Sequence, residues 1–150
     1  MSDILAAIVA GLLGTGAMSV FMWLIHRLGW ANADMIRAIG SIFTKSYDNA
    51  LVPGFVAHFI VGVVIAFGYV AFTNLFSISS FLAFLVIGGM LSIFHGLVFS
   101  FLLVVMVAQH HPLEQFQKAG SEVAVAHFIG HLIYGVVVSA VLGLTTPALF

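Results

Sequence analysis

Three histidines lie deep within long apolar stretches of this sequence, at His58, His95 and His131. A histidine inside a membrane-spanning helix costs free energy and usually faces the bundle interior or a cavity, so each is a candidate functional residue. Neutral imidazole nitrogens ligate haem iron, zinc and copper. His127 lies one helical turn before His131, and Met22 aligns with His95 when the two halves of the chain are superposed, so both are further candidate ligands.

The pattern His-x-x-x-Gly occurs twice, because Gly62 follows His58 and Gly135 follows His131 by one helical turn. Two imidazoles from facing helices are the axial ligands of membrane b-type haems, and a glycine one turn away leaves room for a flat ring. The pattern predicts a haem b, for electron transfer within a membrane complex. The variant is a transition metal ion, copper or zinc, with candidate ligands His58, His95, His131, Met22 and His127.

Other interpretations of the same histidines stay open from the residues alone. Neutral imidazoles that hydrogen-bond across helices, to Ser19, Ser92 or backbone carbonyls, would fix the helix register at about 0.6 to 2 kcal/mol per bond. The chain is then a cofactor-free accessory or scaffold subunit of a membrane complex. A third interpretation is a small channel or carrier whose histidines line a polar path.

Several chemistries are excluded or disfavoured by the residue types. There is no cysteine, so disulfides and thiolate sites are excluded, and only four basic residues leave no footprint for nucleic acid. Every Asp and Glu lies outside the long apolar stretches, which argues against a carboxylate di-iron site and against a triad with a serine nucleophile. No catalytic residue is predicted, and the chain is not expected to be an enzyme.

The elements that position these residues are predicted to be membrane-spanning helices. Hydrophobic residues make up 63% of the 150 residues and charged residues only 6%, and a bilayer-spanning helix needs about 20 mainly apolar residues. The fold class is therefore all-α and polytopic, in one domain over residues 1–150. The four predicted spans are Ile4–Ile25, Phe55–Phe72, Phe81–Ala108 and Val123–Leu144.

An internal repeat relates the two halves of the chain, residues 1–73 and 74–150, without a gap. It aligns His58 with His131 and Gly62 with Gly135, and it carries even a loop residue, Lys45, onto Lys118. Each half contains an even number of spans, so we expect two helical hairpins with the same topology, related by a pseudo-twofold axis along the membrane normal. His58 and His131 then face each other at equal depth.

The basic residues predict the orientation in the membrane. Arg27, Arg37 and Lys45 lie between the first two spans and Lys118 lies between the last two. By the positive-inside rule both of these loops are cytoplasmic and both termini are outside the cytoplasm.

A short amphipathic helix is predicted in the first of these loops, with Asn32 as its N-cap. The pattern indicates an interfacial helix between the first and second spans, or equally a cap over the mouth of the bundle. Its apolar face consists of Met35, Ile36, Ile39, Ile42 and Phe43.

The first and second spans contain glycine-rich motifs, Gly11-Leu-Leu-Gly-Thr-Gly-Ala-Met-Ser19 and Ala57-His58-Phe-Ile-Val-Gly62. The third span contains His95, and the fourth contains His131-Leu-Ile-Tyr-Gly135. Together they resemble a group of small bacterial four-helix membrane proteins known as a domain of unknown function. The resemblance implies the bacterial inner membrane as the location and no established activity. The expected partners are the lipid bilayer and other subunits of a membrane complex or a second copy of the chain.

Overall fold

The computed structural model describes residues 2–103 and 108–145, and four long helices dominate it. They are α1 (Asp3–Arg27), α3 (Leu51–Leu75), α4 (Phe81–Leu102) and α6 (Ser121–Thr145), and each is long and apolar enough to cross a membrane. All four predicted spans are confirmed as helices of this kind, which indicate a membrane protein. The predicted third span continues to Ala108, whereas α4 ends at Leu102 and Ala108 begins a 3₁₀ turn; residues 104–107 lie outside the described residues.

The helix boundaries follow from local chemistry. Helix α3 begins four residues before the predicted start at Phe55, because Pro53 falls in its first turn, where a missing N–H removes no helical hydrogen bond. Helix α4 begins after Ser80, whose hydroxyl accepts a hydrogen bond from the Ala83 N–H at 3.1 Å.

Three short elements join the long helices: α2 (Met35–Thr44), a 3₁₀ turn η2 (Ala108–His110) and α5 (Glu114–Gln117). The predicted short helix is therefore present as α2, but its predicted N-cap is wrong. Asp34 caps α2, and its carboxylate accepts from the Arg37 N–H at 3.4 Å. The Asn32 side chain instead donates to the carbonyl oxygen of Gln115 at 3.0 Å, which ties the first loop to α5.

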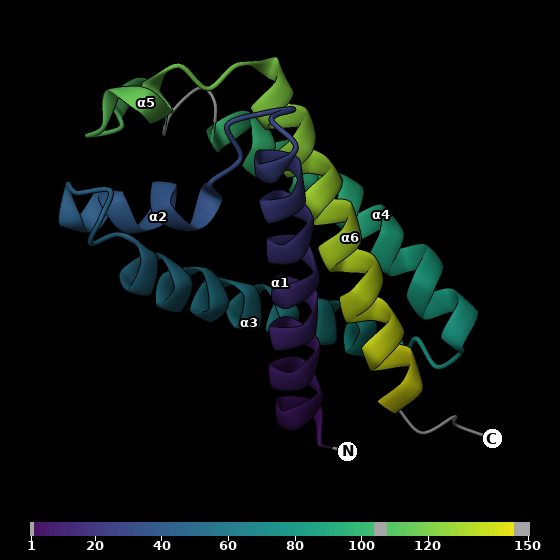
Figure 1. The fold of residues 1–150 in the computed structure, drawn as a ribbon. Helices are drawn as coiled ribbons and strands as arrows, with labels where there is room; N and C mark the ends of the chain where they lie inside the picture. Colours follow the sequence, from purple (N-terminus) through teal and green to yellow (C-terminus); the bar gives the residue numbers. More distant parts are fainter. Residues whose placement is uncertain (1, 104–107, 146–150) are drawn as a thin grey trace.

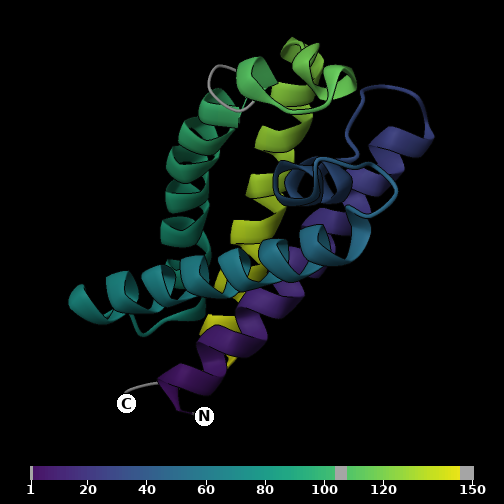
Figure 2. The same cartoon turned by 90° about the vertical axis from the view of Figure 1, so that its left-hand side faces the viewer.

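The long helices pack as two hairpins, α1 with α3 and α4 with α6, and α1 also packs along α6. The axes of α1, α4 and α6 are roughly aligned, with α6 running opposite to the other two, whereas α3 crosses them obliquely (Figure 1; Figure 2). Helix α3 consequently has little contact with α4. The pseudo-twofold relation would make the α1–α6 and α3–α4 contacts equivalent, but these two contacts differ in extent. The packing of the helices therefore does not show this symmetry, and the pseudo-twofold axis stays a prediction.

Small residues let α1 approach two helices at once. A Cβ added at Gly11 would meet the backbone of Val63 in α3, and one added at Gly14 would meet the side chains of Tyr134 and Val138 in α6. Close approach through small residues is the usual basis of helix association in membranes. Helix α1 is therefore the central element of the fold.

Two glycines, one on each helix, let α2 pack directly against the start of α3. A Cβ added at Gly40 would meet the carbonyl oxygen of Ala50, and one added at Gly54 would meet the carbonyl oxygen of Ile36. Met35 of the predicted apolar face is buried, while Phe43 is 68% exposed. The predicted apolar face of α2 is therefore buried at Met35 and exposed at Phe43.

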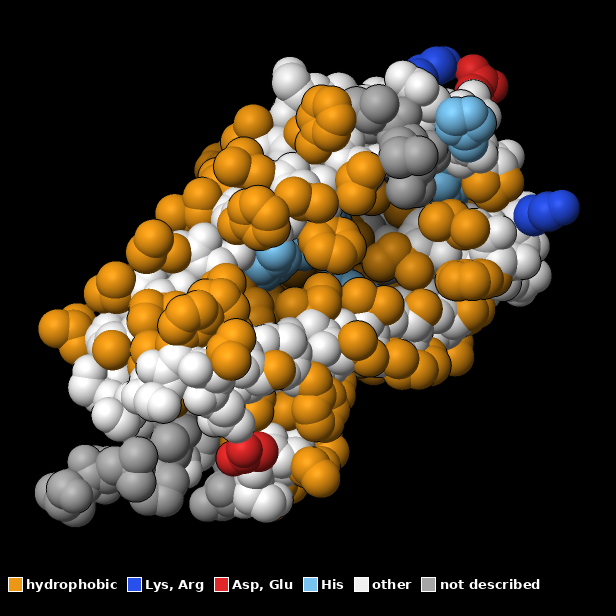
Figure 3. Space-filling model, turned by 180° about the vertical axis from the view of Figure 1, so that it is seen from behind, with side chains coloured by type: hydrophobic (Ala, Val, Ile, Leu, Met, Phe, Trp, Pro, Cys, Tyr) orange, Lys and Arg blue, Asp and Glu red, His pale blue; other side chains and the backbone are white. Residues whose placement is uncertain are grey.

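Large apolar side chains cover much of the outer surface of the four long helices (Figure 3). The termini of the described chain lie at the opposite end of the molecule from α2 and α5 (Figure 1). At the end near α1's start, the Asn74 side-chain amide donates to the Asp3 carboxylate at 2.8 Å, which fixes the end of α3 beside α1.

Candidate functional site

Three histidines line one cavity of about 310 Å³, which we call the inner cavity. His58 comes from α3, and His127 and His131 come from α6, where a spacing of four residues places them on one face. All three are buried, with exposures of 9%, 7% and 7% respectively. The oblique course of α3 opens this cavity, because α3 and α4 diverge on one side of it.

The rest of the inner cavity is apolar or aromatic apart from the hydroxyls of Thr15 and Tyr134. No charged side chain lies among its described lining residues. The space-filling view shows imidazole groups at the bottom of a hollow in an otherwise apolar face (Figure 3). Any polar group that enters this hollow therefore meets neutral ligands in a low-dielectric setting.

A chain of hydrogen bonds connects His131 to two neighbouring helices. His131 Nδ1 lies 2.9 Å from His95 Nε2 on α4, and His95 Nδ1 lies 2.9 Å from the Tyr69 hydroxyl on α3. His95 Nδ1 is also 3.3 Å from the carbonyl oxygen of Leu91. Both ring nitrogens of His95 are thus occupied, and we call Tyr69–His95–His131 the relay.

Four buried imidazole nitrogens have no hydrogen-bond partner among the described residues. Three of them, His58 Nε2, His127 Nδ1 and His131 Nε2, belong to the inner cavity, and the fourth is His26 Nδ1 at the end of α1. A buried polar atom without a partner costs free energy, and such atoms in a native structure call for an explanation, such as a bound ion or water. The rings of His127 and His131 have centroids only 4.8 Å apart. These nitrogens are the groups of the cavity that are available to a ligand.

The two glycines of the repeated pattern serve helix packing. The space of a Cβ at Gly62 is filled by the Thr15 side chain, and that at Gly135 is filled by the Ser92 side chain. Gly62 also lines the inner cavity, and its carbonyl oxygen accepts a hydrogen bond from the Tyr134 hydroxyl at 2.6 Å. The side of each helix that would border a flat ring is therefore already in contact with a neighbouring helix.

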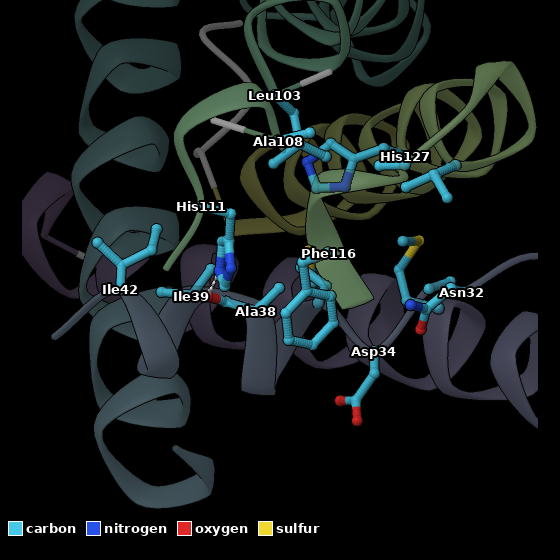
Figure 4. Close-up of a pocket in the computed structure, with 15 residues that line it drawn as sticks. Asn32, Asp34, Ala38, Ile39, Ile42, Leu103, Ala108, His111, Phe116 and His127 are labelled. Atoms are coloured by element: carbon cyan, nitrogen blue, oxygen red, sulfur yellow. Dashed lines mark hydrogen bonds between the residues drawn. The ribbon is translucent and has the colours of Figure 1, made fainter. Parts of the chain in front are cut away.

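Met22 lines a second cavity of about 150 Å³ near α2 and α5. We call it the outer cavity. Its lining side chains include His111, Phe116 and His127 (Figure 4). His127 belongs to the lining of both cavities, and so does Met35. With Ile39 and Leu103, which also line both, these residues form the wall that the cavities share.

The only charged residue that lines the outer cavity is Asp34, in the part of the chain that the structure describes. Its carboxylate points away from the other lining side chains (Figure 4). One oxygen accepts from the Tyr47 hydroxyl at 2.7 Å and the other from the Arg37 N–H. The hydrogen bond to this carboxylate raises the pKa of Tyr47, so the phenol stays a donor at ordinary pH.

Across residues 2–103 and 108–145, no three His, Cys, Asp or Glu side chains converge closely enough to hold a metal ion by themselves. The structure does bring His58, His127 and His131 to one cavity, and it places His95 behind His131 rather than on the cavity. A metal site here would need a ligand of another type beside its imidazoles.

Sequence reasoning gave no role in the site to Tyr69, Met18 or Met35, which lie in the relay or on the inner cavity. A methionine or tyrosine in an apolar helix carries no signal of its own. The hydroxyls of Ser19 and Ser92, expected as partners of the histidines, instead donate to carbonyl oxygens of their own helices, at 2.7 and 2.8 Å.

A family model described as "Family of unknown function (DUF6789)" matches residues 1–148. No curated protein and no solved structure matches the chain.

Proposed function

We propose a function for this chain, which belongs to the DUF6789 family of unknown function, from its own geometry. It is a membrane protein that binds a transition metal ion, copper or zinc, at the inner cavity. The observation that carries the proposal is the set of three buried imidazole nitrogens without partners at one cavity, on His58, His127 and His131. Neutral imidazole is a ligand for both metals.

The relay supports a ligand role for His131. A metal-bound histidine characteristically donates its other ring N–H to a fixed acceptor, which sets the tautomer and orients the ring. With a metal on Nε2, His131 would carry its proton on Nδ1 and donate it to His95 Nε2, 2.9 Å away. His95 then serves as a positioning residue in this proposal.

The close helix contacts at Gly62 and Gly135 favour an ion over a haem. A haem b needs a flat space between its two axial imidazoles, whereas the positions beside these glycines are filled by Thr15 and Ser92. An ion needs only the imidazole nitrogens and a small volume. Electron transfer within a membrane complex is the role predicted for the bound group, and it stays a prediction.

The proposed location is the bacterial inner membrane, with both termini outside the cytoplasm. The four apolar helices support a membrane location, and the basic residues support this orientation because all of them lie in or beside the loops at the α2 and α5 end.

The test is elemental analysis, with oxidised and reduced absorption spectra, of the full chain purified in detergent. We expect stoichiometric copper or zinc in the wild-type protein and its loss in His58→Ala and His131→Ala. His26→Ala is the matched control, because His26 at the end of α1 is not among the residues that line either cavity. Circular dichroism and gel filtration verify that each variant is folded.

A wild-type protein that is folded but free of metal after copper and zinc have been supplied would refute metal binding. A Soret band that disappears in His131→Ala would replace the ion by haem. A folded, colourless and metal-free protein would leave the histidines a packing or partner-binding role, as in the scaffold interpretation.

A further inference from the structure

Three methionines lie buried beside the cavity histidines. Met18 and Met22 on α1 and Met35 on α2 have exposures of 1%, 2% and 5%. Met18 lines the inner cavity, Met22 lines the outer cavity and Met35 lines both. Each cavity is therefore lined by both imidazole and thioether side chains.

A glycine on α6 brings two of these thioethers to the histidine face. A Cβ added at Gly130 would lie 3.3 Å from Met18 Cε and 3.4 Å from Met22 Sδ. Gly130 directly precedes His131 and follows His127 by three residues. The side chains of Met18 and Met22 thus pack against the segment of α6 that carries both imidazoles.

We propose that the metal is Cu(I), bound by imidazole nitrogens together with thioether sulfurs of Met18, Met22 or Met35. This inference rests on the proposed metal-binding function and names the metal and the additional ligands. We call the six residues the imidazole–thioether cluster; they are Met18, Met22, Met35, His58, His127 and His131.

Ligand type is the first argument. Thioether sulfur is a soft ligand that suits Cu(I), whereas the usual protein ligands of zinc are Cys, His, Asp and Glu. No trio of His, Cys, Asp or Glu in the described ranges converges on one site, and methionine sulfur is the soft donor that lines the cavities beside the imidazoles. Cu(I) also accepts two or three ligands, which suits a pair such as His127 and His131 with one methionine.

Charge is the second argument. The Born cost of transferring an ion into a low-dielectric medium rises with the square of its charge, and the inner cavity offers no carboxylate among its described lining residues. Asp34 in the outer cavity is already engaged by Arg37 and Tyr47. A monovalent ion in a neutral ligand set is therefore strongly favoured over a divalent ion.

The test is a competition titration of the full chain in detergent, with Cu(I) against a Cu(I) chelator of known affinity and with Zn²⁺ against a zinc chelator. Met18→Leu and Met22→Leu conserve volume and are tolerated in most cores, so both variants should fold. We expect Cu(I) to bind more tightly than Zn²⁺, and its affinity to fall by at least about tenfold in one or both variants. Met90→Leu, on α4 and 66% exposed, is the matched control and should leave the affinity unchanged.

X-ray absorption of the Cu(I)-loaded wild-type protein gives a second measurement that needs no substitution. A sulfur scatterer in the copper coordination sphere is the expected result. Cu(I) binding that depends on His131 but shows no sulfur scatterer and no effect of the leucine variants would overturn the inference and leave the proposed function standing. Tighter binding of Zn²⁺ than of Cu(I) would do the same, whereas no binding of either metal would refute both.

Discussion

His131 has its two ring nitrogens in different surroundings. Nδ1 is held by His95, and Nε2 has no partner among the described residues of the inner cavity. The Phe99 ring lies against the same imidazole, with centroids 5.6 Å apart. One nitrogen is thus fixed by the protein and the other is presented to the cavity, which is the arrangement expected of a ligand.

The relay can be tested at the residue scale with Tyr69→Phe. The change removes the hydroxyl that lies 2.9 Å from His95 Nδ1 and keeps the ring. Loss of an outer hydrogen-bond partner weakens metal affinity by about tenfold to a hundredfold in known sites, so we expect a fall in Cu(I) affinity of about tenfold. Competition titration measures it.

Tyr134→Phe is the matched variant for this experiment. Its hydroxyl donates to the Gly62 carbonyl oxygen instead of to an imidazole, so we expect a loss of stability of about 1 kcal/mol without a comparable loss of affinity. Equal affinities for wild type and Tyr69→Phe would show that the relay does not support the site.

The sequence is informative about which residues belong to this region and less informative about how they meet. Histidine is costly in a membrane helix, so its depth alone identified His58, His95 and His131 as candidates. The bond between His95 and His131 depends on the rotation of α4 against α6, which hydropathy does not encode. Met18 was missed because a methionine in an apolar helix is indistinguishable from an ordinary core residue.

At the scale of elements, the backbones of α2 and α3 come into direct contact. The backbone of α2 at Gly40 lies directly on the start of α3 at Ala50 and Gly54. His111 holds the same helix from the other loop, because His111 Nε2 is 3.0 Å from the Ala38 carbonyl oxygen. Helix α2 is therefore clamped between α3 and the segment that precedes α5.

We expect Gly40→Ala to disrupt this clamp. The new methyl group would overlap the Ala50 carbonyl, and backbone atoms cannot yield as a flexible side chain can. Overpacking of this kind costs about 1 to 3 kcal/mol, which thermal unfolding in detergent would detect as a lowered Tm.

Gly68→Ala provides the comparison for this substitution. Nothing lies within 4 Å of the added methyl group at this position of α3, and alanine is the better helix former by about 1 kcal/mol. An unchanged or higher Tm is expected there. A Tm for Gly40→Ala that equals that of Gly68→Ala would contradict the close backbone contact.

Hydrophobic length predicted the existence of α1, α3, α4 and α6 and most of their boundaries within a few residues, because each must span the same apolar thickness. It did not predict the oblique course of α3. Tilt is set by packing against neighbouring helices, and the glycine contacts with α1 and α2 that direct α3 are visible only in three dimensions.

At the scale of the whole molecule, charge and apolar surface are segregated. Arg27, Arg37, Lys45 and Lys118 all belong to the α2 and α5 end, while the outer faces of the long helices carry large apolar side chains. This distribution supports one orientation of the whole molecule across a membrane.

The orientation can be measured because the sequence contains no cysteine. We expect Lys118→Cys to react with a membrane-impermeant maleimide only after intact cells are broken, and Ser2→Cys to react from the periplasmic side without lysis. Both positions are exposed, so access is not limited by burial. The reverse pattern would place the α2 and α5 end outside the cytoplasm.

The position of α1 between α3 and α6 has a consequence for assembly during synthesis. Helix α1 leaves the ribosome before α3, α4 and α6, and it can dock on α3 as soon as this pair has been inserted. Its second face, at Gly14 and Met18, faces lipid until α6 arrives. The imidazole–thioether cluster combines residues of α1, α2, α3 and α6, so it is incomplete at every stage of translation before the last helix enters the membrane. Metal capture by the complete cluster would therefore be a post-insertion event, because His127 and His131 enter the membrane only with α6.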